Sequence, residues 1–177
     1  MKTPVAVHRA IVDDIQSIHE VATATWWDTY KDLFPADVIA LCLRRSYSVE
    51  RLRERVQQAD AFLAAERDGL MIGFAQFSRR DVGEALLSSI YVLPEEQGSG
   101  VGTALLEAGV RVLAPIRRLC VEVEERNWKG RRFYREKGFR FTRSFEVSVV
   151  NCPTILHELI LDLSVPAAPT PHSLPAV

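Results

Sequence analysis

A short glycine-rich loop in the middle of the chain has the composition of an anion-binding site. It consists of Gln97, Gly98, Ser99, Gly100, Val101, Gly102 and Thr103. It follows an apolar stretch that stops at Pro94, because proline cannot donate to a sheet ladder. Apolar residues then recur at helical spacing as far as Leu113. Backbone N–H groups at a helix start carry roughly half a positive charge, so we predict a bound phosphate group; a tight turn with nothing bound is the alternative.

The elements around this loop follow an α+β order. Before it, the sequence first predicts a strand over 5–9, a helix capped by Asp13, and helices beginning at Pro35 and Ser48. A hairpin of strands 61–66 and 70–77 joined by Asp68-Gly69 follows, and then a turn at 79–81 and a strand over 85–92. After it come the loop's own helix, a strand over 119–123, a helix from an Asn127 cap to Gly138, and strands over 139–150 and 155–163.

These elements predict a mixed, mostly antiparallel twisted sheet. We expect about seven strands flanked by about four helices. A helical crossover joins the strand that contains Ile90 to the one that begins at Leu119, so those two strands should be parallel. Four of the nine prolines fall in residues 164–177, which have no periodicity, and we expect this tail to be disordered or loosely packed.

Composition excludes several classes of function. The chain has 177 residues, 47% of them hydrophobic, which allows a real core. Its formal net charge of −1 gives no field that would recruit nucleic acid. Cys42, Cys120 and Cys152 form no CxxC pair, so we expect no metal site and reduced thiols in a cytoplasmic protein. No apolar run approaches the ~18 residues of a membrane span, and we expect no membrane partner.

The chain resembles the GCN5-related N-acetyltransferases, the GNAT superfamily. One hallmark is a Q/R-x-x-G-x-G/A loop after the fourth strand, matched by Gln97, Gly100 and Gly102. Another is an Asn after the fifth strand, then a Tyr seven residues later and a Gly-Phe pair, matched by Asn127, Tyr134, Gly138 and Phe139. The resemblance covers residues 5–163, so residues 1–163 are expected to form one N-acetyltransferase domain.

The resemblance implies acetyl-CoA as donor and an amine as acceptor, with no metal. Backbone N–H groups of residues 97–103 would bind the pyrophosphate, with Asn127 and Tyr134 also at the cofactor site. The backbone of Ile90, Tyr91 and Val92 would pair with the pantetheine arm like an added strand. In this fold the two parallel strands splay apart at that point, and the thioester lies in the gap.

The reaction needs groups that stabilise an oxyanion and move protons. An amine attacks the thioester carbonyl, and a strand N–H near Val92 could stabilise the oxyanion. The departing thiolate, with a pKa near ~8.5 by analogy with cysteine, is helped by a proton, for which Tyr134 is the candidate acid. Glu84 is the candidate base, acting through a water, and Glu122, Glu124 and His157 compete with it.

The first helix is expected to contribute to the acceptor site. Residues 25–35 resemble the W-x-x-T-Y region of GNAT members that act on small amines such as polyamines. Trp27 and Tyr30, with Asp28 and Asp32, would form an aromatic and acidic wall for a cationic acceptor, or for the amine of a peptide. A homodimer through the C-terminal strands is a further expectation.

Two other functions compete with acetyl transfer. A dinucleotide-dependent oxidoreductase would explain a strand, a glycine loop and a helix, but Thr103 stands where the third glycine of G-x-G-x-x-G should fall. A non-catalytic CoA-binding sensor would explain why the strand before the loop carries Ser88 and Ser89, and no glutamate, at its middle.

Overall fold

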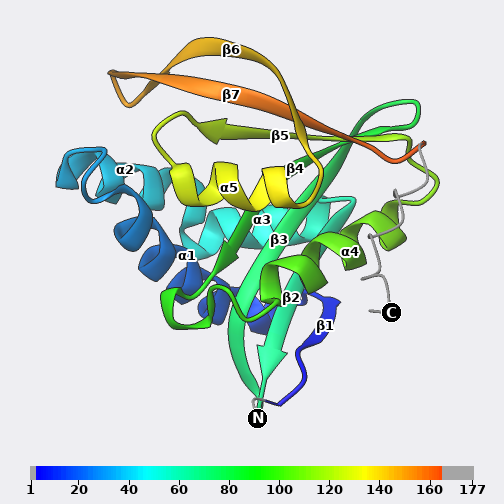
Figure 1. Ribbon diagram of the computed structural model, residues 1–177. Helices are drawn as coiled ribbons and strands as arrows, with labels where there is room; N and C mark the ends of the chain where they lie inside the picture. The colour runs from blue at the N-terminus through cyan, green and yellow to red at the C-terminus, as the bar shows by residue number, and fades with distance from the viewer. Residues whose placement is uncertain (1–2, 165–177) are drawn as a thin grey trace, which may run out of the picture.

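A computed structural model describes residues 3–164. Seven strands form one sheet: β1 (Ala6–Arg9), β2 (Ala61–Arg67), β3 (Leu70–Asp81), β4 (Glu84–Val92), β5 (Arg118–Glu124), β6 (Arg140–Val149) and β7 (Cys152–Asp162). Five α-helices flank it: α1 (Ile15–Tyr30), α2 (Ala36–Tyr47), α3 (Val49–Gln58), α4 (Val101–Leu113) and α5 (Trp128–Glu136). Short 3-10 helices cover Val12–Asp14 and Pro94–Glu96. In Figure 1, α4 and α5 lie in front of the sheet, and α1, α2 and α3 lie behind it.

The strand order is β1-β2-β3-β4-β5-β7-β6, and every neighbouring pair except β4–β5 is antiparallel. The α4 crossover makes β4 and β5 parallel, as predicted. Their pairing begins at Glu84 opposite Arg118 and ends at Leu87 opposite Val121. Beyond that point the strands are no longer paired, so the predicted fold class, including a divergent parallel pair, is confirmed.

A β-bulge in β4 lies where the two strands separate. Leu87 and Ser89 face consecutive residues of β3, which leaves Ser88 as an extra residue. The bulge changes the alternation of the strand, because Leu87 and Ile90 both pack on the α4 side, whereas Tyr91 packs on the α1 side. On that second side Arg55 of α3 donates to the Ser89 hydroxyl at 3.1 Å, so a helix supports the bulge from behind.

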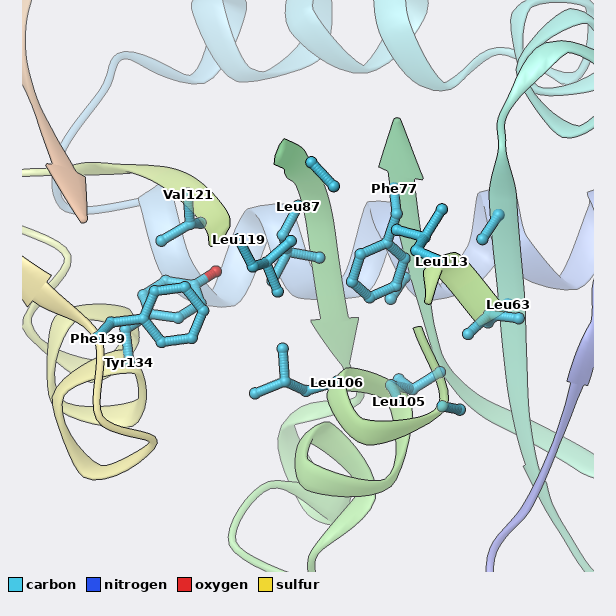
Figure 2. Packing of buried hydrophobic residues seen from close by; sticks show 14 of the residues in the cluster. Leu63, Phe77, Leu87, Leu105, Leu106, Leu113, Leu119, Val121, Tyr134 and Phe139 are labelled. Atoms are coloured by element: carbon cyan, nitrogen blue, oxygen red, sulfur yellow. The ribbon is translucent and has the colours of Figure 1, made fainter. Parts of the chain in front are cut away.

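Each face of the sheet has its own hydrophobic core. The α4 and α5 face buries, among others, Leu63, Phe77, Leu87, Leu105, Leu119, Val121 and Tyr134 (Figure 2). The opposite face packs α1, α2 and α3 on Phe62 and Phe74. Both cores are needed to hold α1 and α5 on opposite sides of the gap between β4 and β5.

Some sequence expectations differ in detail from the structure. Asp13 does not cap α1: the N-cap position is Asp14, whose side chain makes no capping bond to α1 and instead accepts the backbone N–H of Ile11 at 2.8 Å, because a 3-10 turn precedes the helix. Residues 79–81 belong to β3, and the turn falls on Val82 and Gly83. The Asp68-Gly69 turn is confirmed, with φ values of 52° and 75°. The expectation for the tail concerns residues that, except for Ser164, lie outside the described part. Within residues 3–164, no helix has the length and apolar character needed to cross a membrane.

Candidate active site

A cleft of about 740 Å³ opens where β4 and β5 diverge. It is lined by the last half of β4, the glycine loop, the end of β5, one face of α5 and one face of α1. Because α5 and α1 lie on opposite faces of the sheet, the cleft spans the gap between the strands. Two different molecules could therefore approach the gap from different directions.

The glycine loop leaves its backbone accessible at one end of the cleft. Gly98 and Gly100 have φ values of 74° and 88°, a region that side chains disfavour, and a Cβ at either would meet no atom within 4 Å. Gly100 precedes the first turn of α4, whose leading N–H groups have no partner within the helix. Gln97, Gly98, Gly100, Gly102 and Thr103 line the cleft. The loop backbone therefore has open space beside it in the cleft.

Two residues of the predicted loop face away from the cleft. Val101 is buried in the core beneath α4. The Ser99 hydroxyl donates to the backbone oxygen of Glu96 at 2.6 Å, and Ser99 does not line the cleft. Of the two, Val101 could offer its backbone N–H to a ligand, whereas the N–H of Ser99 already donates to the Glu96 carbonyl at 3.4 Å.

The free edge of β4 faces the cleft. The carbonyl of Val92 accepts from Gln97 at 3.2 Å and lies 3.5 Å from the Thr25 hydroxyl, whereas the N–H of Leu93 donates to β3 at Ile72. In an extended strand the N–H and C=O of one residue point to the same edge, so the N–H of Val92 also faces the gap. Ile90, two residues earlier, shares this edge. The Tyr91 side chain turns to the other face, where Trp26 and Tyr47 donate to its hydroxyl.

Asn127 and Tyr134 are brought to the cleft by α5. The Asn127 side chain caps the helix by accepting the N–H of Gly130 at 3.0 Å, and Gly138 ends it with a φ of 88°. Tyr134 is 7% exposed, with its ring against Phe133 and Phe139. Figure 2 shows its hydroxyl oxygen directed away from α5, toward the strands. Burial raises the pKa of Tyr134, so the hydroxyl stays protonated at neutral pH.

The structure does not bring Glu84 to the cleft, which corrects that prediction. Glu84 is the first residue of β4, and the cleft begins only at Leu87. Its carboxylate lies 3.6 Å from Arg118 and accepts the Cys120 thiol at 3.5 Å. Strand periodicity could not show this, because the separation of β4 from β5 depends on the bulge.

Of the competing groups, Glu122 lines the cleft, where Arg80 donates to it at 2.6 Å. Glu124 is 5% exposed and is held by Arg126 and Thr154. His157 contacts Glu125 and opens into a separate hollow of about 630 Å³ beyond α5. Glu122 is thus the one of these three that lines the cleft.

On α1 the structure places Tyr30 at the cleft but not Trp27. Trp27 is 38% exposed and lies outside the lining. Trp26 packs on Tyr30 with ring centroids 4.6 Å apart, because residues four apart share a helix face. Thr25 and Thr29 also line the cleft and were missed, although their spacing in register with Tyr30 could have indicated them.

Comparison with known proteins gives a consistent result. Residues 22–139 match the acetyltransferase (GNAT) family. The spermidine N(1)-acetyltransferase of Thermoplasma acidophilum is 25% identical over 143 residues, which cover 77% of this chain and 88% of that protein. An uncharacterised N-acetyltransferase of Mycobacterium tuberculosis is 33% identical over 91 residues, 49% of this chain and 58% of that one.

Solved structures share the fold. The PaiA N-acetyltransferase of Thermoplasma acidophilum, in complex with coenzyme A, has a TM-score of 0.76 at 23% identity, covering 88% of this chain and 98% of that one. The ribosomal-protein-S18-alanine N-acetyltransferase of Escherichia coli has a TM-score of 0.70 at 18% identity, covering 97% and 100%. The mixed sheet excludes the doubly wound dinucleotide-binding alternative. This chain belongs to the GNAT family of acetyltransferases.

Proposed function

We propose that the protein transfers the acetyl group of acetyl-CoA to a primary amine of a small, polyamine-like molecule or of a peptide. The observation that carries this proposal is the cleft itself. It joins an anion-binding helix start, a free strand edge and a buried tyrosine in the gap between β4 and β5. A thioester with a long pyrophosphate-bearing arm suits this combination of groups.

The chain's backbone would bind the donor. The N–H groups of Gly98 and of residues 100–103, at and before the start of α4, favour the pyrophosphate, because they lie at the positive end of a helix, whereas those of Gln97 and Ser99 donate to the carbonyls of Pro94 and Glu96. The edge of β4 at Ile90 and Val92 offers strand-like hydrogen bonds to the amide groups of the pantetheine arm. Asn127 keeps α5 in place beside that arm.

Val92 and Tyr134 would act on the thioester. The N–H of Val92 faces the gap and can stabilise the oxyanion that forms when the amine attacks. Tyr134 can then donate a hydrogen bond to the departing thiolate and stabilise the charge on the sulfur as the carbon–sulfur bond breaks. Complete proton transfer is uphill, because burial raises the pKa of the tyrosine further above that of the thiol, near ~8.5.

Glu122 would accept the proton that the amine loses. It lines the cleft from β5, where Arg80 donates to its carboxylate, and it would act through a water. This assignment replaces Glu84.

The properties of the three cysteines favour direct attack in a ternary complex over an acetyl-cysteine intermediate. Burial raises the pKa of Cys42, and burial together with Glu84 raises the pKa of Cys120 to about 11. Thiols of this kind are poor nucleophiles at neutral pH. None of the three cysteines lines the cleft, so an acetyl-cysteine intermediate has no support.

The acceptor would reach the gap from the side of α1, where Thr25, Thr29 and Tyr30 line the cleft. Similarity to a spermidine N(1)-acetyltransferase supports a small amine. The test is a thiol-release assay with acetyl-CoA against spermidine, other diamines, lysine peptides and peptide N-termini. We expect acceptor-dependent CoA release and an acetylated product. Binding of acetyl-CoA without turnover of any amine would favour the CoA-binding sensor instead.

A further inference from the structure

A buried ion pair connects the far end of β2 to the segment that enters the glycine loop. Arg67 is the last residue of β2, and its guanidinium donates to a carboxylate oxygen of Glu96 and, at 2.9 Å, to the carbonyl of Thr3. The two side chains are only 8% and 15% exposed. Such a pair is costly to break, because removing one partner leaves a charge enclosed by protein.

Glu96 also contacts the glycine loop directly, through Ser99. The Ser99 hydroxyl donates to the Glu96 backbone oxygen at 2.6 Å and lies 3.2 Å from its carboxylate. Ser99 stands between Gly98 and Gly100, whose positive φ values give the loop its shape. The contacts of Glu96 with both Arg67 and Ser99 therefore hold the middle of the loop in position.

Glu96 also lines the cleft, beside the N–H groups that the proposed function uses for a pyrophosphate. A carboxylate at that place would repel an anion unless its charge were balanced. Arg67 provides the balance from within the protein.

We propose that Arg67 is a positioning residue for the donor: it acts through Glu96 to hold the pyrophosphate loop in shape and to cancel the carboxylate charge beside it. This inference rests on the proposed function. It requires that loss of Arg67 and loss of the Glu96 charge have different effects: the first exposes the anion to an unbalanced negative charge, whereas glutamine at 96 removes that charge and keeps a side-chain oxygen that can accept from Arg67.

The experiment measures the Kd of CoA by titration calorimetry, and the KM of acetyl-CoA and kcat, for full-length Arg67→Met, Glu96→Gln and the double variant. We expect Arg67→Met to raise Kd and KM by about tenfold or more and to leave kcat within about twofold. Glu96→Gln alone should leave Kd within about twofold or lower it, and the double variant should recover most of the affinity.

Arg143→Met is a control for loss of an arginine ion pair elsewhere, because it breaks the pair with Glu158 at 3.1 Å on β6 and β7, away from the loop. It should leave the Kd of CoA unchanged. If Arg67→Met does not fold, Glu96→Gln decides, since a clear loss of affinity there would contradict the charge argument.

Equal losses in both single variants without recovery in the double variant would show a purely structural role and overturn the inference. Unchanged affinity in Arg67→Met would also overturn it, while leaving the proposed function intact. If the wild-type protein itself does not bind CoA, the proposed function fails, and this inference fails with it.

Discussion

At the scale of single residues, Tyr134 is the group whose surroundings bear most on catalysis. Burial between Phe133 and Phe139 raises its pKa and keeps its proton in place at neutral pH. We predict that Tyr134→Phe lowers kcat by about 10²-fold, the usual contribution of a general acid, and leaves the Kd of acetyl-CoA nearly unchanged. Steady-state kinetics gives the kcat of this variant, and titration calorimetry gives its Kd for acetyl-CoA. An intact kcat would remove Tyr134 from the mechanism.

Gly100 offers a second test, and the chain contains a matched control for it. Gly100 and Gly69 have φ values of 88° and 75°, and an added Cβ would meet nothing within 4 Å at either. Valine at each position should therefore cost a similar stability, about 1–2 kcal/mol. Only Gly100→Val should weaken acetyl-CoA binding, because its side chain would stand between the ligand and the loop backbone. Thermal unfolding and binding titrations compare the two; equal affinities would contradict the role of the loop.

The residues predicted from sequence were those whose role depends on neighbours along the chain. Local spacing sets the glycine loop, the Asn127 cap and Tyr134. The structure places Asn127, Tyr134 and all of the loop except Ser99 and Val101 around one cleft. Glu84 and Trp27 were wrongly placed, because the first depends on where β4 parts from β5 and the second on the rotation of α1 about its axis. Neither the point where the strands separate nor the rotation of the helix can be read from a few neighbouring residues.

At the scale of elements, the close approach of α4 to β3 depends on one glycine. A Cβ at Gly109 would lie 2.1 Å from the Phe77 ring, so the helix can approach the sheet only because this residue is glycine. We predict that Gly109→Ala destabilises the protein by about 1–3 kcal/mol through overpacking. Val112→Ala, on the exposed side of the same helix, should change stability by less than about 0.5 kcal/mol. Denaturant unfolding measures both, and a neutral Gly109→Ala would show that α4 can shift freely.

The strands β6 and β7 are joined by a charge contact that should depend on pH. Hydrogen bonds from Arg143, then from Thr142, lower the pKa of Glu158. A carboxyl with a lowered folded pKa stabilises the fold above its unfolded pKa, near ~4.3, and loses that effect as pH falls through the folded value. Glu158→Gln should therefore cost about 1 kcal/mol at pH 7 and progressively less as pH falls below about 4.3 and through the lowered folded value. The exposed Glu146→Gln is the control, and a pH-independent cost for Glu158→Gln would contradict this account.

Element order and type were largely readable from the sequence, because helical and strand periodicities are local. The β-bulge at Ser88 was not, since it exists only in the register of β4 against β3. That single extra residue changes which side chains of β4 face α1, and with it the composition of the cleft. The actual turn at Val82 and Gly83 was missed because Arg79-Arg80-Asp81 has turn-like polarity but continues β3 at its exposed end.

At the scale of the whole molecule, the two cores have a joint consequence. One holds α5 against the sheet and the other holds α1, and the cleft between them passes through the gap between β4 and β5. The donor and the acceptor can then be present together, each approaching the gap from its own side. A covalent acetyl-enzyme is not needed in such an arrangement, and no cysteine is placed to form one.

The most direct test of this account is an initial-rate study in which acetyl-CoA and the best amine acceptor are both varied. Direct attack in a ternary complex predicts double-reciprocal lines that intersect, CoA release only in the presence of acceptor, and no acetylated protein by mass spectrometry. Parallel lines, with an acetyl group found on Cys42, Cys120 or Cys152 after incubation with acetyl-CoA alone, would contradict it.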